Sequence, residues 1–233
     1  MNSIVLFRGL PMATLIVFTA GCALVVLRPA GGAPRSLWSR PPGDPRARLW
    51  RFAWCVLAAT HAVEWVFPGC VVAWDARPAR LYALEVIGLA AGVVVLAACG
   101  VALRRHLRRD GRDGRELANA IFLAMATVGV TSGLALAVLD RWASSWGATV
   151  LAPYVRSVVN GTPRAEYVAT MPFVVRLHVF SAFAAIAALP FTTAAASAAY
   201  ALARRRARQA TPVREESADD GELEPSLPEQ SQL

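Results

Sequence analysis

The stretch LYALEVIGLAAGVVVLAACGVAL, Leu81–Leu103, carries a single charged residue, Glu85. Because a helix needs about 20 apolar residues to cross the hydrocarbon core of a bilayer, this stretch predicts a transmembrane helix. The chain is 56% hydrophobic with a mean hydropathy of +0.43 over 233 residues, more apolar surface than one soluble core would hide. We therefore predict an all-α fold, an integral membrane bundle of five transmembrane helices. The other four apolar stretches are Leu10–Leu27, Phe52–Trp74, Leu117–Leu139 and Met171–Leu202.

The formal net charge is +8, and all of the positively charged residues are arginines, since the chain has no lysine. Most of the 24 arginines lie between the first and second apolar stretches, between the third and fourth, or in the tail after the fifth. If each stretch crosses the membrane once, these three segments lie on the same side. The positive-inside rule then predicts an N-terminus outside and a C-terminus in the cytoplasm. A nucleic-acid partner is not expected, because its binding would need these clusters on a folded soluble face.

The chain divides into two predicted parts. Residues 1–210 form the five-helix membrane domain, and residues 211–233 form a disordered acidic cytoplasmic tail, too polar to pack. The external segment Asp140–Thr170 is longer than a simple turn. Within it, Val150–Val159 is expected to form a short helix along the membrane face.

Two histidines, His61 and His178, lie inside apolar stretches, where an unpaired ionisable group is costly. By helical rise, His61 lies roughly 13 Å and His178 roughly 10 Å from the outer surface on helices of opposite direction. Low-spin b-type haem takes two axial imidazoles from facing helices, so the pair is a candidate ligand set for one haem iron. The alternative is that each ring hydrogen-bonds a neighbouring helix backbone. His106 lies among arginines and is not a candidate.

Other ionisable residues adjoin this pair in sequence. Glu64 follows His61 by one helical turn, and Glu85 lies near the outer end of its helix, so either is a candidate proton acceptor for quinol oxidation. The alternative is that both are interfacial, solvated, or paired with Arg80 or Arg176. Arg176, two residues before His178, is also a candidate partner for a haem propionate, because its forked guanidinium matches a carboxylate.

Three motifs resemble the gamma subunit family of respiratory nitrate reductase, a membrane cytochrome b. MPFVVRLHVFSAFAAIAALPFT at 171–192 is similar to the family's fifth helix, THAVEWVFPG at 60–69 to its haem-bearing second helix, and YVRSVV at 154–159 to its external helix. The likeness covers about Leu49–Ser197. It implies a multi-pass bacterial plasma-membrane protein in which His61 and His178 ligate the distal haem, near the site of menaquinol or ubiquinol oxidation.

The chain departs from the family where a second, proximal haem would be bound. Arg51 and Ala196 stand at the positions of the other two histidines, so one haem b is expected. The family's quinol-site lysine has no counterpart, and Arg80 or Tyr82 falls near its place. Three routes for the electron remain open: a partner cluster that reaches into the membrane, a redox partner on the outer face, or altered chemistry in a divergent relative.

The function expected from these features is membrane anchor and electron transfer in a quinol-dependent, nitrate-reductase-like oxidoreductase. The resemblance implies iron–sulfur and molybdenum-cofactor subunits as partners, which would hold the substrate-reducing site. The alternative function is a haem-free membrane anchor or assembly protein of a respiratory complex.

Overall fold

The computed structural model describes residues 3–27, 44–108, 114–139 and 143–210, and these residues form helices joined by turns. The acidic tail lies outside the described residues, so its predicted disorder stays a prediction. The elements are α1 (Ser3–Leu27), α2 (Pro45–Val66), α3 (Pro68–Asp75), α4 (Pro78–Leu107), α5 (Gly114–Leu139), α6 (Ala143–Trp146), the π-helix η1 (Gly147–Leu151), α7 (Ala152–Val159), α8 (Glu166–Ala169), α9 (Phe173–Ala188), the 3-10 helix η2 (Leu189–Phe191) and α10 (Thr193–Ala210).

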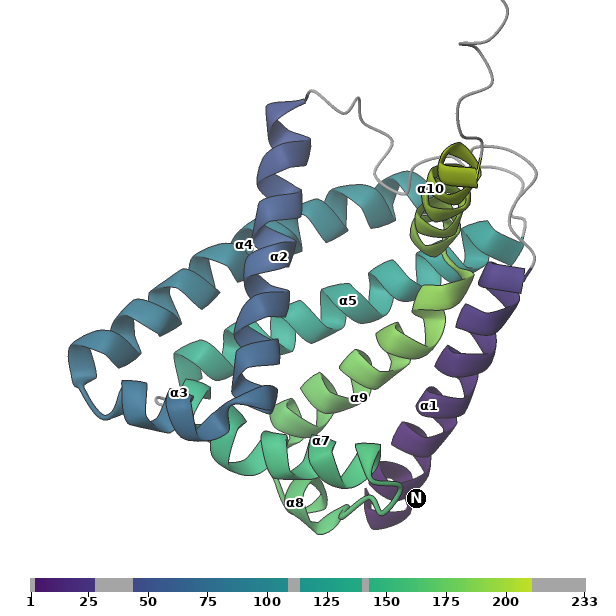
Figure 1. Ribbon diagram of the computed structural model, residues 1–233. Helices are drawn as coiled ribbons and strands as arrows, with labels where there is room; N and C mark the ends of the chain where they lie inside the picture. The colour runs from purple at the N-terminus through teal and green to yellow at the C-terminus, as the bar shows by residue number, and fades with distance from the viewer. Residues whose placement is uncertain (1–2, 28–43, 109–113, 140–142, 211–233) are drawn as a thin grey trace, which may run out of the picture.

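Four long helices lie side by side in the order α4, α5, α9, α1, and α2 crosses this layer over α4 (Figure 1). The short elements α3, α6, η1, α7 and α8 gather at one end of the bundle, and we call this the short-helix end. The beginning of α2 and the helix α10 lie at the other end, which we call the arginine end. The short helix predicted within Val150–Val159 is confirmed as α7.

The structure has four helical segments long and apolar enough to cross a membrane among the described residues, namely α1, α4, α5 and Phe173–Phe191. A fifth span results only if α2 and α3 are counted together. The prediction of an all-helical membrane protein is therefore confirmed, with four to five candidate spans. The orientation of the bundle across the bilayer stays a prediction.

The second apolar stretch, predicted as one helix over Phe52–Trp74, is instead broken by a bend of 103° between α2 and α3. Pro68 occupies the first turn of α3, and Phe67 leaves helical geometry at φ −124° and ψ 52°. Proline has no N–H to continue the ladder and favours extended backbone in the residue before it. Arg156 of α7 donates from Nη2 to the Val66 carbonyl at 3.2 Å, which ties α7 to the bend.

The fifth apolar stretch is broken in a similar way. The helix α9 ends at Ala188, Pro190 lies in the single 3-10 turn η2, and α10 begins at Thr193. The side-chain Oδ1 of Asn119 on α5 accepts the Thr193 N–H at 2.9 Å and so caps the new helix. The prediction of one helix over Met171–Leu202 is therefore corrected at Pro190, and the arginines of α10 belong to a separate helix.

Proline also explains a long-range contact at the short-helix end. Pro11 lies inside α1, so the Phe7 carbonyl four residues earlier has no helical N–H partner. The Tyr154 hydroxyl of α7 donates to this carbonyl at 2.7 Å, and both side chains are buried. This contact joins the N-terminal helix to the short-helix end.

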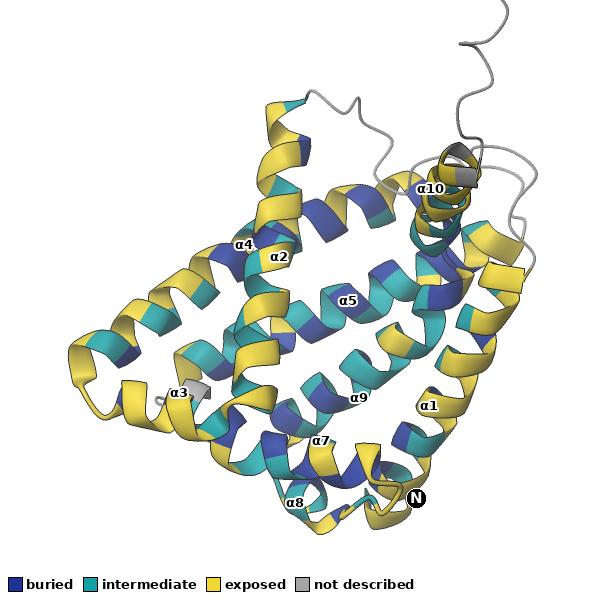
Figure 2. Cartoon of the chain, viewed as in Figure 1, coloured by how far each residue is buried: buried dark blue, intermediate teal, exposed yellow. Residues whose placement is uncertain are grey.

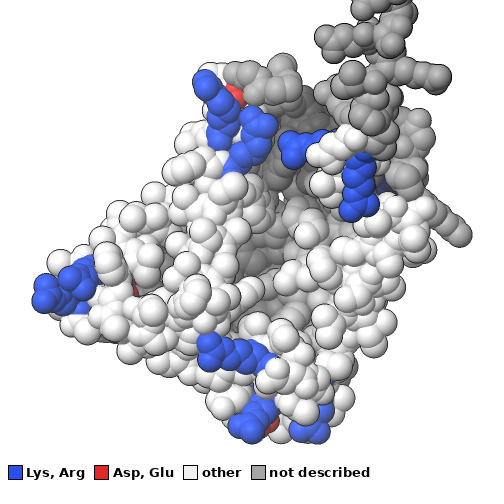
Figure 3. All heavy atoms as spheres, viewed as in Figure 1, with Lys and Arg blue, Asp and Glu red and all other residues white. Residues whose placement is uncertain are grey.

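Charge and burial divide the molecule as expected for a bundle surrounded by lipid. Arginines gather at the two ends of the visible face, and the surface between them carries few charged side chains (Figure 3). Many large apolar side chains on α1, α2 and α4 are exposed, whereas buried residues concentrate where the helices face one another (Figure 2). An exposed apolar belt of this kind is stable in hydrocarbon.

Candidate functional site

The rings of His61 on α2 and His178 on α9 face each other inside the bundle. Their centroids are 6.2 Å apart and their planes are inclined by 30°. Two metal–imidazole bonds of about 2 Å each, together with the two ring radii, separate coaxial imidazoles on one iron by roughly 6 Å. The structure thus brings together the two histidines that the sequence paired, at the spacing that a shared metal requires.

Each ring has one nitrogen committed to a helix backbone. His61 Nδ1 lies 2.8 Å from the Leu57 carbonyl on its own helix, and His178 Nδ1 lies 2.8 Å from the Gly129 carbonyl on α5. A carbonyl only accepts, so both Nδ1 atoms carry the hydrogen and each Nε2 keeps its lone pair. This tautomer is the one that a metal ligated through Nε2 needs. The backbone contacts considered as an alternative to ligation are present, and they leave ligation open.

Small residues on α5 allow the close approach of His178. A Cβ on Gly133 would come within 3.0 Å of His178 Cε1, and one on Gly129 within 3.0 Å of Ser181 Oγ. Ser132, between them in sequence, places its Oγ 3.4 Å from His178 Nδ1. Glycines four residues apart let membrane helices pack closely, and this pair makes room for an imidazole.

The two histidines line one cavity of about 1080 Å³. Its walls come mainly from α2, α4, α5 and α9, with η1 and α7 at the short-helix end, and they are largely apolar. Cofactor sites usually measure about 300–1,000 Å³, so the cavity has room for a large planar group. Figure 3 shows the hollow between the ridge of α2 and the helices behind it.

Both candidate carboxylates, Glu64 and Glu85, are half-buried and line the same cavity. Glu64 reaches toward the short-helix end, where a Cβ on Gly147 would come within 2.7 Å of its Oε2. Tyr154 also lines the cavity, but its hydroxyl is engaged with the Phe7 carbonyl.

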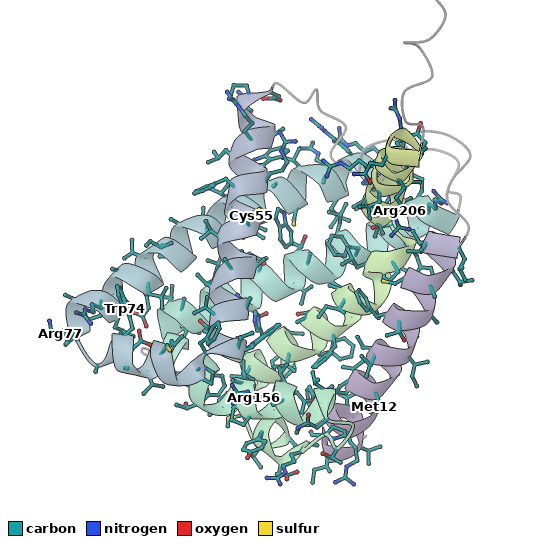
Figure 4. The ribbon with its side chains drawn as sticks, in the orientation of Figure 1. Met12, Cys55, Trp74, Arg77, Arg156 and Arg206 are labelled. Carbon is teal, nitrogen blue, oxygen red and sulfur yellow. The ribbon has the colours of Figure 1, made fainter. Side chains whose placement is uncertain are left out.

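Three other residues singled out in the sequence do not line the cavity: Arg80, Tyr82 and Arg176. The Arg80 guanidinium lies 5.0 Å from the Trp74 ring centroid, and Tyr82 is 54% exposed. The Arg176 Nη1 donates to Ser3 Oγ on α1 at 2.9 Å. Figure 4 labels Trp74 beside Arg77, at the corner where α3 turns into α4.

The positions of the missing second histidine pair lie toward the arginine end. Arg51 is exposed and Ala196 is buried. Trp54, one helical turn after Arg51 on α2, stacks with Phe122 at a centroid distance of 6.4 Å, and both pack against a cluster of small buried residues. The members of this cluster are Ala53, Ala91, Val95, Cys99, Ala102, Leu123 and Ala126. Trp54, Phe122 and Ala126 also line the cavity, and neither Arg51 nor Ala196 offers an imidazole.

Sequence reasoning missed Gly129, Ser132 and Gly133, which position His178. The spacing G-x-x-x-G at 129–133 is a signal that could have found the two glycines. It also missed the contact between Ser145 of α6 and Asp75 of α3, where Ser145 Oγ donates to Asp75 Oδ2 at 2.9 Å. No sequence pattern pairs two residues that far apart.

The fold and the site define a class: a helical membrane protein with two converging imidazoles in an apolar, cofactor-sized cavity. The family model of the nitrate reductase gamma subunit matches residues 46–206, and the chain belongs to that family. The resemblance seen in the motifs is thereby confirmed. Among curated proteins, none matches this chain. Family membership implies the role of membrane cytochrome b anchor in respiratory nitrate reductase, an oxidoreductase complex, together with quinol and the alpha and beta subunits.

The haem b that the family typically binds can be tested against the residues present. The centroid spacing of His61 and His178, their Nδ1 hydrogen bonds and the apolar cavity all suit an iron porphyrin held by two Nε2 atoms. The side chains therefore fit the group.

Proposed function

We propose that this chain is the haem b-containing membrane anchor and electron-transfer subunit of a quinol-oxidising respiratory nitrate reductase complex. The observation that carries the proposal is the 6.2 Å spacing of the His61 and His178 rings with both Nδ1 atoms engaged by backbone carbonyls. Neutral imidazoles fixed in this tautomer are suited to hold one iron between two helices.

The bound haem would accept single electrons from quinol and pass them on. The chain's own residues would do the rest. His61 and His178 would hold the iron, and the carbonyls of Leu57 and Gly129 would fix the ring orientations and increase ligand basicity. The apolar walls would exclude water, and Glu64 or Glu85, which line the cavity, would accept protons from the quinol hydroxyls. Arg80, Tyr82 and Arg176 do not line the cavity and are not part of this proposal.

The arginine distribution supports an N-terminus outside, with the short-helix end toward the outer face and the arginine end toward the cytoplasm. In that orientation quinol is oxidised in the outer half of the bilayer and protons leave to the outside. Residues 1–210 would act as the membrane domain and 211–233 as a cytoplasmic tail. Nitrate would be reduced on partner subunits that carry molybdenum cofactor and iron–sulfur clusters.

A single haem is proposed because Arg51 and Ala196 replace the second histidine pair. An electron from the outer half then has to reach its acceptor without a second haem. Either a partner cluster extends into the membrane or the acceptor docks on the outer face.

A difference spectrum of the purified full-length chain, supplied with haem during expression, tests the proposal. We expect a sharp b-type α-band on reduction with dithionite and the same band on reduction with menadiol, a soluble naphthoquinol. The absence of the band in haem-supplemented preparations would contradict the proposal and favour a haem-free anchor. A band that dithionite develops and menadiol does not would contradict the quinol-oxidising role.

A further inference from the structure

The titratable residues that line the cavity, among the described ones, are His61, Glu64, Glu85, Tyr154 and His178. Three of them are poor proton acceptors for a bound quinol. The two histidines are proposed to coordinate iron through Nε2, and the Tyr154 hydroxyl donates a hydrogen bond to the Phe7 carbonyl. Among the residues that the structure describes, this leaves the carboxylates of Glu64 and Glu85 as the candidate bases within the cavity.

Glu64 is distinguished by its neighbours on the side away from the cavity. Its carboxylate lies against the backbone of Gly147 at the start of η1. Ser145, two residues earlier in the chain, also lines the cavity and donates to Asp75 Oδ2 at 2.9 Å. Glu64 and Asp75 lie close enough for their charges to interact. A second carboxylate thus lies behind the first, with a hydroxyl between the cavity and Asp75.

Asp75 is only 5% exposed, although it ends α3 at the short-helix end of the molecule. Burying a carboxylate is costly unless it is hydrogen-bonded or serves a function. Its Oδ2 accepts a hydrogen bond from the Ser145 hydroxyl inside the molecule. A purely structural role would be to hold α3 against α6, and the test below separates that role from proton transfer.

Resting on the proposed function, we propose that Glu64, Ser145 and Asp75 form the path by which quinol protons leave the cavity toward the outer face. Glu64 is the catalytic base, and Asp75, anchored by Ser145, is a positioning residue and second proton carrier. The path runs through the α2–α3 bend, which brings the end of α3 beside α6.

The proton and electron balance is simple. Quinol loses two protons and two electrons and becomes quinone. For each proton, a quinol O–H bond breaks, the pair stays on oxygen, and a new O–H bond forms on the Glu64 carboxylate. Glu64 then returns to carboxylate as the proton passes by way of the Ser145 hydroxyl to Asp75 and from there toward the outer face. A b-type haem held by His61 and His178 would take up the two electrons one at a time, and an acceptor of the iron–sulfur class would receive them. Both carboxylates are restored after each proton.

The experiment measures haem reduction by menadiol in a stopped-flow instrument, using the full-length haem-loaded chain in proteoliposomes over a series of pH values. We expect Glu64→Gln to slow reduction roughly hundredfold, as loss of a general base does. Asp75→Asn is expected to slow it about tenfold and to change the rate–pH profile, because it removes a negative charge that interacts with the Glu64 carboxylate. Glu166→Gln makes the same chemical change on exposed α8 and is expected to match wild type.

Ser145 provides a second test if Asp75→Asn does not hold haem. Ser145→Ala should slow reduction about tenfold, and Ser145→Thr, which keeps the hydroxyl, should restore most of the rate. Wild-type rates and profiles in fully haem-loaded Asp75→Asn or Ser145→Ala would overturn the path while leaving the proposed function intact. A slowed Glu85→Gln beside an unaffected Glu64→Gln would overturn it too. If menadiol does not reduce the wild-type haem at all, the proposed function fails and the path with it.

Discussion

His178 Nδ1 on α9 donates to the Gly129 carbonyl on α5 at 2.8 Å. Gly133, four residues after Gly129, lies on the same face of α5, and the His178 ring lies over it. The ring is thus held by one hydrogen bond and by the absence of a side chain beneath it. Gly129 and Gly133 therefore have two effects: they allow α9 to pack closely on α5, and they orient the His178 ring.

We expect Gly133→Val to displace the His178 ring and to lower haem occupancy several-fold. Even a Cβ at Gly133 would lie only 3.0 Å from His178 Cε1, and the two valine methyl groups extend further. Overpacking of this kind typically costs about 1–3 kcal/mol. The measurement is haem per chain by absorbance of the purified variants.

The control is Gly100→Val on α4, where a Cβ would meet nothing within 4 Å. It introduces the same β-branched side chain into a helix without touching the site, so its haem occupancy should equal that of wild type. Equal occupancy in the two variants would show that the tight contact at Gly133 does not position His178.

Tyr154→Phe is expected to lower the free energy of unfolding by about 1–3 kcal/mol, because it leaves the buried Phe7 carbonyl without a partner. Pro11 removes the helical donor that would otherwise replace the hydroxyl. Denaturation in mild detergent, followed by tryptophan fluorescence, measures the change. Tyr82→Phe removes an equivalent hydroxyl from a side chain that is 54% exposed and should change the stability by less than about 0.5 kcal/mol. Similar losses in both variants would contradict the role of the Tyr154–Phe7 bond.

The same tyrosine predicts a dependence of stability on pH. Burial raises the pKa of Tyr154 above the ordinary value of 10.0. The unfolded chain therefore releases this proton at lower pH than the folded one, so the stabilisation is complete below about pH 10 and declines as the pH rises further. The slope attributable to one group is at most about −1.4 kcal/mol per pH unit. The stability difference between wild type and Tyr154→Phe should shrink above pH 10, and a constant difference would contradict the assignment.

Arg156→Ala is expected to loosen the bend between α2 and α3. Its Nη2 donates to the Val66 carbonyl at 3.2 Å, and Figure 4 labels it on α7 near that bend. Because Arg156 is exposed, the expected loss of unfolding free energy is small, about 0.5–1.5 kcal/mol. Arg164→Ala removes an exposed arginine from the same end of the molecule and should cost less than about 0.5 kcal/mol. Chemical denaturation of both variants distinguishes the bond from a general effect of arginine.

The sequence predicted the helical membrane fold well because length and apolarity decide it. The stretch Leu81–Leu103 needs no partner to be recognised as a span, since all of its side chains except that of Glu85 are apolar or small and are stable in lipid. The two bends were harder. Pro68 and Pro190 were visible in the sequence, but proline is tolerated in membrane helices when neighbouring groups satisfy the freed backbone. Arg156 at one bend and Asn119 at the other come from distant parts of the chain, and only the packed structure shows them.

The histidine pair was predictable because helical rise alone gives the depth of a residue. Depth does not give the direction in which a side chain points around the helix axis. For that reason the sequence grouped Arg176 with His178, whereas the structure directs Arg176 to Ser3 on α1. Arg80 is a similar case: its sequence position is near that of the family's quinol-site lysine, but its guanidinium lies over the Trp74 ring. Asp75 escaped notice because its partner Ser145 is brought to it only by the bend.

The haem-to-chain ratio of the purified full-length protein shows whether His61 and His178 hold one haem, with haem measured as the pyridine haemochrome and protein by quantitative amino-acid analysis. We predict one haem per chain in wild type and none in His61→Ala or His178→Ala. His106→Asn, whose amide can replace Nδ1 toward Glu116, should keep the full ratio. Full haem retention in either of the first two variants, or two haems per wild-type chain, would contradict the assignment of His61 and His178 as the ligands of a single haem.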